Sequence, residues 1–137
     1  MSFVLDSSAT LAWVYIDENT PDIQAIFDLL LKDGAWVPGL WKIEVANALE
    51  MGVRRGRCTI PFRDVALTNL LLLPIHVDPE TDGQAWGATL QLASRHRLTL
   101  YDAVYLELAV RRGLPLVTLD KELRSAAHAE GVPVLGT

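Results

Sequence analysis

The sequence predicts an α/β fold, a three-layer α/β/α sandwich around a parallel sheet of about four to five strands. Short apolar runs suited to buried strands recur along the chain and alternate with longer segments of helical character. Half of the 137 residues are hydrophobic, which is enough for a substantial core. Because the sequence has no repeats, low-complexity stretches or linkers, residues 1–137 are expected to form a single domain.

Signals at helix ends delimit the elements in the first half of the chain. Ser7 and Ser8 follow the first apolar run and are favoured N-cap residues, and Pro21 stands where a first helical residue is expected. Gly34 and Pro74 each close a helix. The expected strands are 3–6, 35–37 and 75–77, and the expected helices are 9–15, 20–33, 61–73 and one that follows Pro38-Gly39 and runs to Gly52 or Gly56.

The second half continues the alternation. We expect an amphipathic helix over 79–95, a nearly apolar helix over 101–112, a strand over 114–119, a helix over 121–130 and an edge strand over 132–135. The helix over 101–112 has few polar positions, so it should be covered on most sides. In open parallel sheets of this kind, functional sites form beyond the carboxyl ends of the strands.

Composition narrows the class of protein. The net charge of −5 is unfavourable for binding nucleic acid through Lys and Arg alone, although bound cations would change the local potential. The single cysteine, Cys58, excludes an internal disulfide and a cysteine metal cluster. The apolar runs are too short to span a bilayer and the first residues do not resemble an export signal. A cytoplasmic protein without a membrane partner is therefore expected.

Four carboxylates stand where the chain is otherwise apolar. Asp6 and Asp120 each follow a predicted strand, while Glu44 interrupts one apolar helix and Asp102 opens another. A buried carboxylate without a partner is costly, so such groups are usually hydrogen-bonded, paired or bound to metal. Taken singly, each aspartate could cap a helix and Glu44 could face solvent.

Taken together, the four acids indicate a site for a divalent cation. Because Asp6 and Asp120 both follow strands, they are expected at the same edge of the sheet. Asn47 lies three residues after Glu44, on the same helix face, and could orient its carboxylate. Ligation by oxygen alone suits Mg²⁺ or Mn²⁺ rather than zinc. Such a site is typical of a metal-dependent phosphodiesterase.

Four short motifs resemble, in order and spacing, those of the PIN domain: Asp6-Ser7, Glu44-Val45-Ala46-Asn47, Tyr101-Asp102-Ala103 and Thr118-Leu119-Asp120. The resemblance covers essentially the whole chain, whose length is similar to that of the VapC-type toxin ribonucleases of toxin–antitoxin pairs. It implies a Mg²⁺- or Mn²⁺-dependent endoribonuclease that cleaves an RNA substrate. It also implies a homodimer and a cognate antitoxin whose C-terminal segment lies across the active-site groove.

The resemblance assigns a role to each acid. Asp6 and Asp102 would bind the metal directly, and Asp120 would hold a second, weaker metal or its waters. Glu44 would act through water or orient the nucleophile. The implied reaction hydrolyses an RNA phosphodiester bond and leaves 5′-phosphate and 3′-hydroxyl ends.

Neighbouring polar residues are expected to orient the acids through hydrogen bonds. Ser7 matches the family's frequent Asp-Ser pair, and Thr118 matches the hydroxyl residue before the last acid. Asn47 is expected to support Glu44, and Thr99 is a further candidate because it precedes Asp102 closely.

Two other classes of α/β protein fit the sequence less well. A haloacid dehalogenase-type phosphatase needs an Asp where the run Asp6-Ser7-Ser8-Ala9-Thr10 has Ser8, and a receiver domain needs an acidic pair after the first strand. No His in the sequence has the spacing of a catalytic or metal-binding pair. A housekeeping PIN nuclease and a metal-binding interaction module without catalysis stay open.

Two tryptophans near the predicted site have two interpretations. Trp13 and Trp41 lie on the helices that follow Asp6 and carry Glu44. They are expected in the core, and the alternative is a surface that accepts an apolar antitoxin helix.

Overall fold

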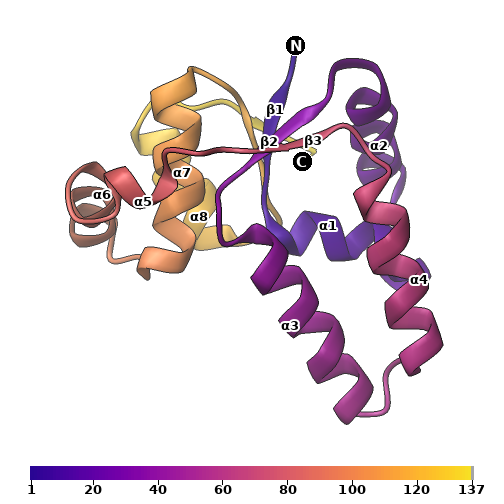
Figure 1. The fold of residues 1–137 in the computed structure, drawn as a ribbon. Helices are drawn as coiled ribbons and strands as arrows, with labels where there is room; N and C mark the ends of the chain where they lie inside the picture. Colours follow the sequence, from indigo (N-terminus) through magenta and orange to yellow (C-terminus); the bar gives the residue numbers. More distant parts are fainter. Residues whose placement is uncertain (137) are drawn as a thin grey trace.

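A computed structural model describes residues 1–136 and contains one five-stranded sheet flanked by helices (Figure 1). The strands are β1 (Phe3–Leu5), β2 (Ala35–Val37), β3 (Ile75–Val77), β4 (Leu116–Val117) and β5 (Val134–Leu135). Their order is β3-β2-β1-β4-β5, and every neighbouring pair is parallel. The predicted parallel sheet is confirmed, with five strands.

The helices form two groups, one from each half of the chain. The first group is α1 (Ser7–Val14), α2 (Pro21–Asp33), α3 (Trp41–Arg54) and α4 (Ile60–Leu71), with a short 3₁₀ helix, η1 (Ile16–Glu18). The second is α5 (Thr81–Gln84), α6 (Ala88–His96), α7 (Leu100–Arg112) and α8 (Lys121–Ala129). Figure 1 shows α1, α2 and α4 on one side of the sheet and α5 to α8 on the other, as the predicted sandwich requires. Within residues 1–136, no helix has the length and apolar character needed to cross a membrane.

The central strand and α7 form the middle of the core. The three residues of β1 are fully buried, as expected for a strand with a neighbour on each side. Helix α7 packs against β1 and β4, and its residues 103–109 are all buried. The prediction that this helix is covered on most sides is therefore correct.

A partly buried ion-pair network connects α7 to the edge of the sheet. The Arg111 guanidinium lies 2.7 Å from Asp78 Oδ2 and 2.7 Å from Glu107 Oε2. Arg112 pairs with the other oxygen of Asp78 at 3.0 Å and stacks on the Trp36 ring, 3.7 Å from its centroid. Because Asp78 follows β3 and Trp36 lies in β2, the network fixes α7 relative to both strands.

The helix predicted over 79–95 is divided into α5 and α6. Gly87 has φ −110° and ψ −106°, which lie outside the helical region. Glycine is a weak helix former, and this stretch holds Gly83 as well as Gly87. The prediction of helical structure is correct for each half of the segment, but the prediction of one continuous helix is wrong.

The strand predicted over 114–119 is shorter than expected. Only Leu116 and Val117 join the ladder, because the Leu114 N–H still bonds to the Ala109 carbonyl at the end of α7, 3.0 Å away. On the other side, Thr118 leaves the ladder and turns its hydroxyl toward Asp6.

Candidate active site

The four predicted acids all stand at the beginning of helices. Asp6 is the N-cap of α1 and Asp120 is the N-cap of α8, while Glu44 lies in the first turn of α3 and Asp102 in the first turn of α7. Helix N-termini carry partial positive charge, which favours carboxylates. Four separate helix starts therefore bring four carboxylates to the carboxyl edge of the sheet.

Asp6 is the most buried of the four, with 5% of its surface exposed. Its Oδ1 accepts hydrogen bonds from the Ala9 N–H at 3.0 Å and the Ser8 hydroxyl at 2.7 Å. Its Oδ2 accepts a hydrogen bond from the Thr118 hydroxyl. Burial raises the pKa of Asp6 above its ordinary value, and repulsion from Asp102 adds to this, although the hydrogen bonds oppose both effects.

Thr118 connects the first and last acids. Its hydroxyl donates to Asp6 and accepts a hydrogen bond from the Asp120 N–H at 3.0 Å. Its carbonyl accepts a hydrogen bond from Arg124 Nε at 2.9 Å. The side chain of Thr118 is almost fully buried, so both acids are tied to one fixed hydroxyl. Thr118 thus contacts both acids, and the orienting role expected for it stays a prediction.

Glu44 is held by a residue from another helix. Its carboxylate accepts a hydrogen bond from the Tyr105 hydroxyl of α7. Burial raises the pKa of Glu44, and repulsion from Asp102 and Asp6 raises it further, whereas the Tyr105 hydrogen bond lowers it. Burial also raises the pKa of Tyr105 beyond its ordinary range, with Glu44 adding to the effect and Ser7 opposing it. The predicted Ser7 therefore lies beside Tyr105.

The predicted role of Asn47 has less support. Asn47 is exposed on α3, and the hydrogen-bond donor to Glu44 within residues 1–136 is Tyr105. Thr99, in contrast, is placed as expected next to Asp102. It is the N-cap of α7, and its hydroxyl accepts a hydrogen bond from the Asp102 N–H at 3.2 Å.

Electrostatic repulsion links the acids into one group. The pKa of Asp102 is raised first by burial and then by repulsion from Asp120 and Glu122. Asp102 in turn raises the pKa of Asp6 and Glu44, in each case after burial. Asp102 therefore lies within range of the charges of the other three predicted acids.

The donor set fits a hydrated Mg²⁺ or Mn²⁺. Within residues 1–136, no three Asp, Glu, His or Cys side chains converge closely enough to enclose an ion by themselves. Mg²⁺ does not require such a cage, because it keeps several waters and is commonly bound through one or two carboxylates plus substrate phosphate. Carboxylates that repel one another, as Asp102 and Asp6 do, are suited to this type of coordination.

Sequence reasoning missed two contacts of the site. Ser8, expected only as a helix cap, donates to Asp6 and accepts a hydrogen bond from the Leu119 N–H at 3.1 Å, so it joins the start of α1 to the loop after β4. Tyr105 was not singled out. Its position three residues after Asp102, on the same face of the helix, was the available signal.

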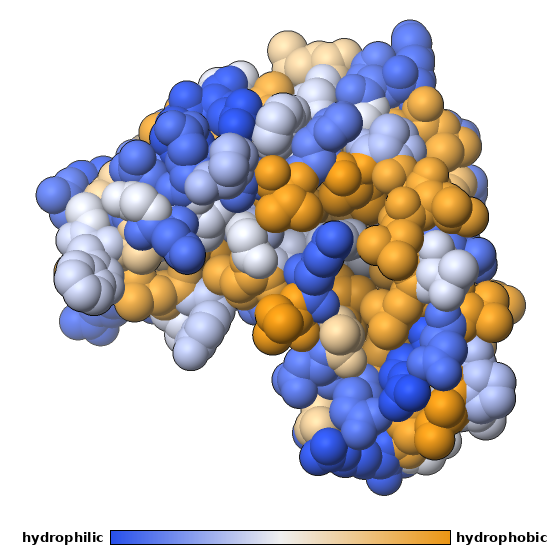
Figure 2. Space-filling model, viewed as in Figure 1, coloured by the Kyte–Doolittle hydropathy of each residue, from blue (hydrophilic) through white to orange (hydrophobic). Residues whose placement is uncertain are grey.

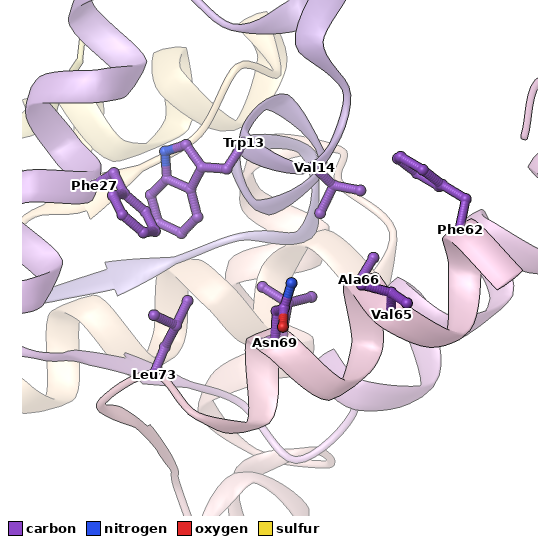
Figure 3. Close-up of a pocket in the computed structure, with 9 residues that line it drawn as sticks. Trp13, Val14, Phe27, Phe62, Val65, Ala66, Asn69 and Leu73 are labelled. Atoms are coloured by element: carbon purple, nitrogen blue, oxygen red, sulfur yellow. The ribbon is translucent and has the colours of Figure 1, made fainter.

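The two tryptophans have different environments. Trp41 is buried, with 4% of its surface exposed, and its ring N–H donates to Thr10 Oγ1 at 3.0 Å. Trp13 is partly buried and packs edge-to-face on Phe27 at 5.4 Å. Figure 3 shows the rings of Trp13 and Phe27 in an apolar groove that faces α4. Trp41 is thus a core residue, and Trp13 also lines a surface.

This apolar groove has a volume of about 260 Å³. It is lined by Trp13, Val14, Phe27, Phe62, Val65, Ala66, Asn69, Leu70 and Leu73. Several apolar side chains of α4 are open to solvent, among them Val65 at 60% exposure. Figure 2 shows hydrophobic residues gathered over the part of this face where Figure 1 places α1 and α4. The groove is therefore an exposed apolar surface, separate from the acidic site.

Comparison with solved structures agrees with the fold. The crystal structure of PAE2754 from Pyrobaculum aerophilum superposes with a TM-score of 0.68 at 28% identity, covering 92% of this chain and 84% of that one. VapBC2 from Rickettsia felis, solved bound to a DNA fragment from its promoter, gives a TM-score of 0.67 over 98% of this chain and 97% of that chain. At 10% identity, the second likeness concerns the fold alone.

Comparison of sequences identifies the family. Ribonuclease VapC3 from Mycobacterium tuberculosis is 32% identical over 133 aligned positions, and the match covers 93% of this chain and 91% of that protein. Ribonuclease VapC3 from Pyrobaculum aerophilum is also 32% identical, over 145 aligned positions that cover 100% of this chain and 99% of that protein. The family model of the PIN domain matches residues 3–129. The chain therefore belongs to the PIN domain family and is similar to its VapC ribonucleases.

Proposed function

We propose that this protein is a Mg²⁺- or Mn²⁺-dependent endoribonuclease and acts as the toxin of a toxin–antitoxin pair. The observation that carries the proposal is the group of four carboxylates, each at a different helix start and linked by mutual repulsion. Membership of the PIN domain family and the ribonuclease relatives support the choice of substrate. The RNA substrate and the metal dependence belong to the proposal.

The acids have distinct roles in this proposal. Asp6 and Asp102 bind the cation directly, and Asp120 holds a second cation or its waters. A bound divalent cation would neutralise charge on the phosphate and make water a better nucleophile. All the donors are oxygens, as these ions prefer.

The protein's own groups orient the reaction. Asp6 is fixed by Ser8 and Thr118, so its direction does not depend on the substrate. Glu44 is half-buried, has a raised pKa and is held by Tyr105, which suits it to orient the attacking water. Attack at phosphorus with departure of the 3′ oxygen leaves a 5′-phosphate and a 3′-hydroxyl end.

The apolar groove between α1, α2 and α4 is proposed to accept an amphipathic helix of the antitoxin. The similarity to VapC proteins supports such a partner, and Val65 and Phe62 are exposed along the groove. Helix-in-groove binding places the apolar face of a partner helix against side chains of this kind.

The protein is also proposed to form a homodimer, which sedimentation analysis would test.

Cleavage of total cellular RNA tests the enzyme. Wild-type protein and the Asp6→Asn and Asp102→Asn variants are compared in Mg²⁺, in Mn²⁺ and in EDTA. The matched control is Asp22→Asn, which removes an exposed carboxylate from the first turn of α2, away from the site. We expect discrete cuts from the wild type and the control, only with metal, and none from the two site variants. Equal cleavage by all four proteins would refute the assignment.

A further inference from the structure

A second cavity lies beside the acidic site, between the end of α6 and one face of α8. Its volume is about 330 Å³, and it is lined by His96, Arg97, Glu122, Ser125, Ala126 and Ala129. The two alanines present small apolar side chains from α8, while the other four residues supply polar groups. The cavity is open to solvent and therefore combines a small apolar patch with exposed hydrogen-bonding groups.

Both walls of this cavity connect directly to the acidic site. On α8, the Glu122 N–H donates to Asp120 Oδ1 at 2.8 Å. On the other wall, Arg97 is separated from Thr99, the N-cap of α7, only by the buried Leu98. A group bound in the cavity would thus lie next to a phosphate at the acidic site.

The two opposite charges in the cavity are not paired with each other. Among residues 1–136, neither Arg97 nor Glu122 belongs to an ion pair. The charged residues next to them, in contrast, form ion pairs. Glu130 binds Arg95 at 2.8 Å and His96 at 2.6 Å. One free guanidinium and one free carboxylate therefore face the same space.

The backbone at Arg97 is unusual for an arginine. Arg97 has φ 55° and ψ 40° at the C-cap of α6, and within residues 1–136 it is the one residue other than glycine with positive φ. The corresponding position after α7 is Gly113, with φ 64°. Glycine adopts this conformation without the steric cost that a side chain brings. The guanidinium is thus placed at the cavity by a backbone conformation that favours glycine.

We propose that this cavity binds an unpaired guanine base of the RNA, adjacent to the phosphate that is cleaved. Guanine presents two acceptors, O6 and N7, which match the paired donors of Arg97, and two donors, N1–H and the N2 amino group, which match the carboxylate of Glu122. The base face would rest on Ala126 and Ala129. RNA is commonly recognised through such splayed-out bases. This inference rests on the proposed ribonuclease function.

The charge of the cavity favours a base over a phosphate. A phosphate group would meet the Glu122 carboxylate as well as Arg97, and repulsion from Glu122 would oppose its binding. A neutral base satisfies both groups. This is why the cavity is assigned to a nucleobase, although it lies beside a site for phosphodiester cleavage.

Fluorescence anisotropy tests the proposal without depending on cleavage. The probes are labelled hexauridylates that carry one guanosine at each position in turn, bound to the Asp102→Asn protein in Mg²⁺. We expect guanosine at one position to tighten binding about tenfold over hexauridylate. Inosine, which lacks the N2 amino group, and 7-deazaguanosine, which lacks N7, should each lose most of this gain.

Two further substitutions assign the contacts. In the same background, Arg97→Gly should abolish the sensitivity to 7-deazaguanosine, and Glu122→Ala should abolish the sensitivity to inosine. Because glycine suits the backbone at position 97, Arg97→Gly should keep or raise the melting temperature, so a lost preference would not reflect misfolding. Arg55→Gly is the matched control, because Arg55 is exposed, lies elsewhere, and belongs to no ion pair among residues 1–136.

The outcomes separate this inference from the proposed function. Equal binding of guanosine and uridine probes, or a guanosine preference that survives both substitutions, would overturn the guanine assignment while leaving the nuclease intact. Guanosine-selective binding by a wild-type protein that cleaves no RNA in Mg²⁺ or Mn²⁺ would uphold the cavity and refute the nuclease.

Discussion

The hydroxyl of Tyr105 donates a hydrogen bond to the carboxylate of Glu44, although the two residues are 61 positions apart in the sequence. The bond joins α7 to α3 across the acidic site. Since α7 also carries Asp102, one helix both supplies an acid and positions another. Tyr105 is therefore a positioning residue in the proposed reaction.

Tyr105→Phe is predicted to change the pH dependence of cleavage. The hydrogen bond from Tyr105 lowers the pKa of Glu44, so its loss should raise that pKa further above the ordinary value. If the reaction needs ionised Glu44, the acidic limb of the rate profile should move to higher pH, while stability should fall by only about 1 kcal/mol. Tyr101→Phe, the same change at a tyrosine that is 67% exposed, is the control. An unshifted limb would mean that Glu44 does not act in its ionised form.

Asp102→Asn is predicted to leave the metal-free protein as stable as the wild type, or more so, at neutral pH. The folded pKa of Asp102 is raised above its ordinary value of 3.8, so the folded state binds the proton more tightly than the unfolded state. The unfolding free energy therefore falls as pH rises from 3.8 through the raised pKa of Asp102. The substitution removes this loss of stability. Thermal unfolding in EDTA at pH 3 and pH 7 should show the gain only at pH 7. A clear loss at pH 7 would count against a cluster of repelling acids.

Asp6→Ala is predicted to behave differently from Asp102→Asn. Asp6 caps α1 through the Ala9 N–H and accepts bonds from Ser8 and Thr118, so its removal should cost about 1 kcal/mol or more. Relief of repulsion from Asp102 should offset part of this cost. Chemical denaturation in EDTA would measure the balance, and a net gain in stability would show that repulsion outweighs the cap.

Asp78→Asn is predicted to weaken the fold away from the acidic site. Burial alone would raise the pKa of Asp78, but hydrogen bonds from Arg111 and Arg112 lower it to about 2. The resulting stabilisation of the folded state is fully present above pH 3.8, the ordinary pKa of an aspartate. It disappears as the pH falls toward the folded pKa of about 2. The variant should lose about 2 kcal/mol at pH 7 and match the wild type near pH 2. Asp28→Asn, an exposed change on α2, should show no such pH-dependent difference.

Val65→Asp is predicted to abolish antitoxin binding while sparing RNA cleavage. Val65 is 60% exposed in the apolar groove, so a charge there would face any apolar helix that docks. Leu31→Asp, a similar change at a residue of α2 that does not line the groove, is the control. Co-purification with the antitoxin would report binding. If Val65→Asp still binds, the antitoxin docks on another surface.

Local signals made the acids predictable. Asp6 and Asp120 follow apolar runs, and strand ends in a parallel sheet share one edge, so their positions followed from the order of elements. Thr118 was identified through a motif and lies between the same two acids. The continuity of the helix over 79–95 was mispredicted because hydrophobic periodicity does not register the backbone break at Gly87.

The sequence by itself determined the alternation of strands and helices, the parallel sheet and the chain positions of the four acids, because capping residues and apolar periodicity act over a few neighbouring residues. Only the tertiary structure decided that Tyr105 rather than Asn47 supports Glu44, and that Arg97 and Glu122 face one cavity. These relationships depend on how α3, α6, α7 and α8 pack around the sheet. Packing joins residues that are distant in the chain, and no local pattern encodes which side chains will meet.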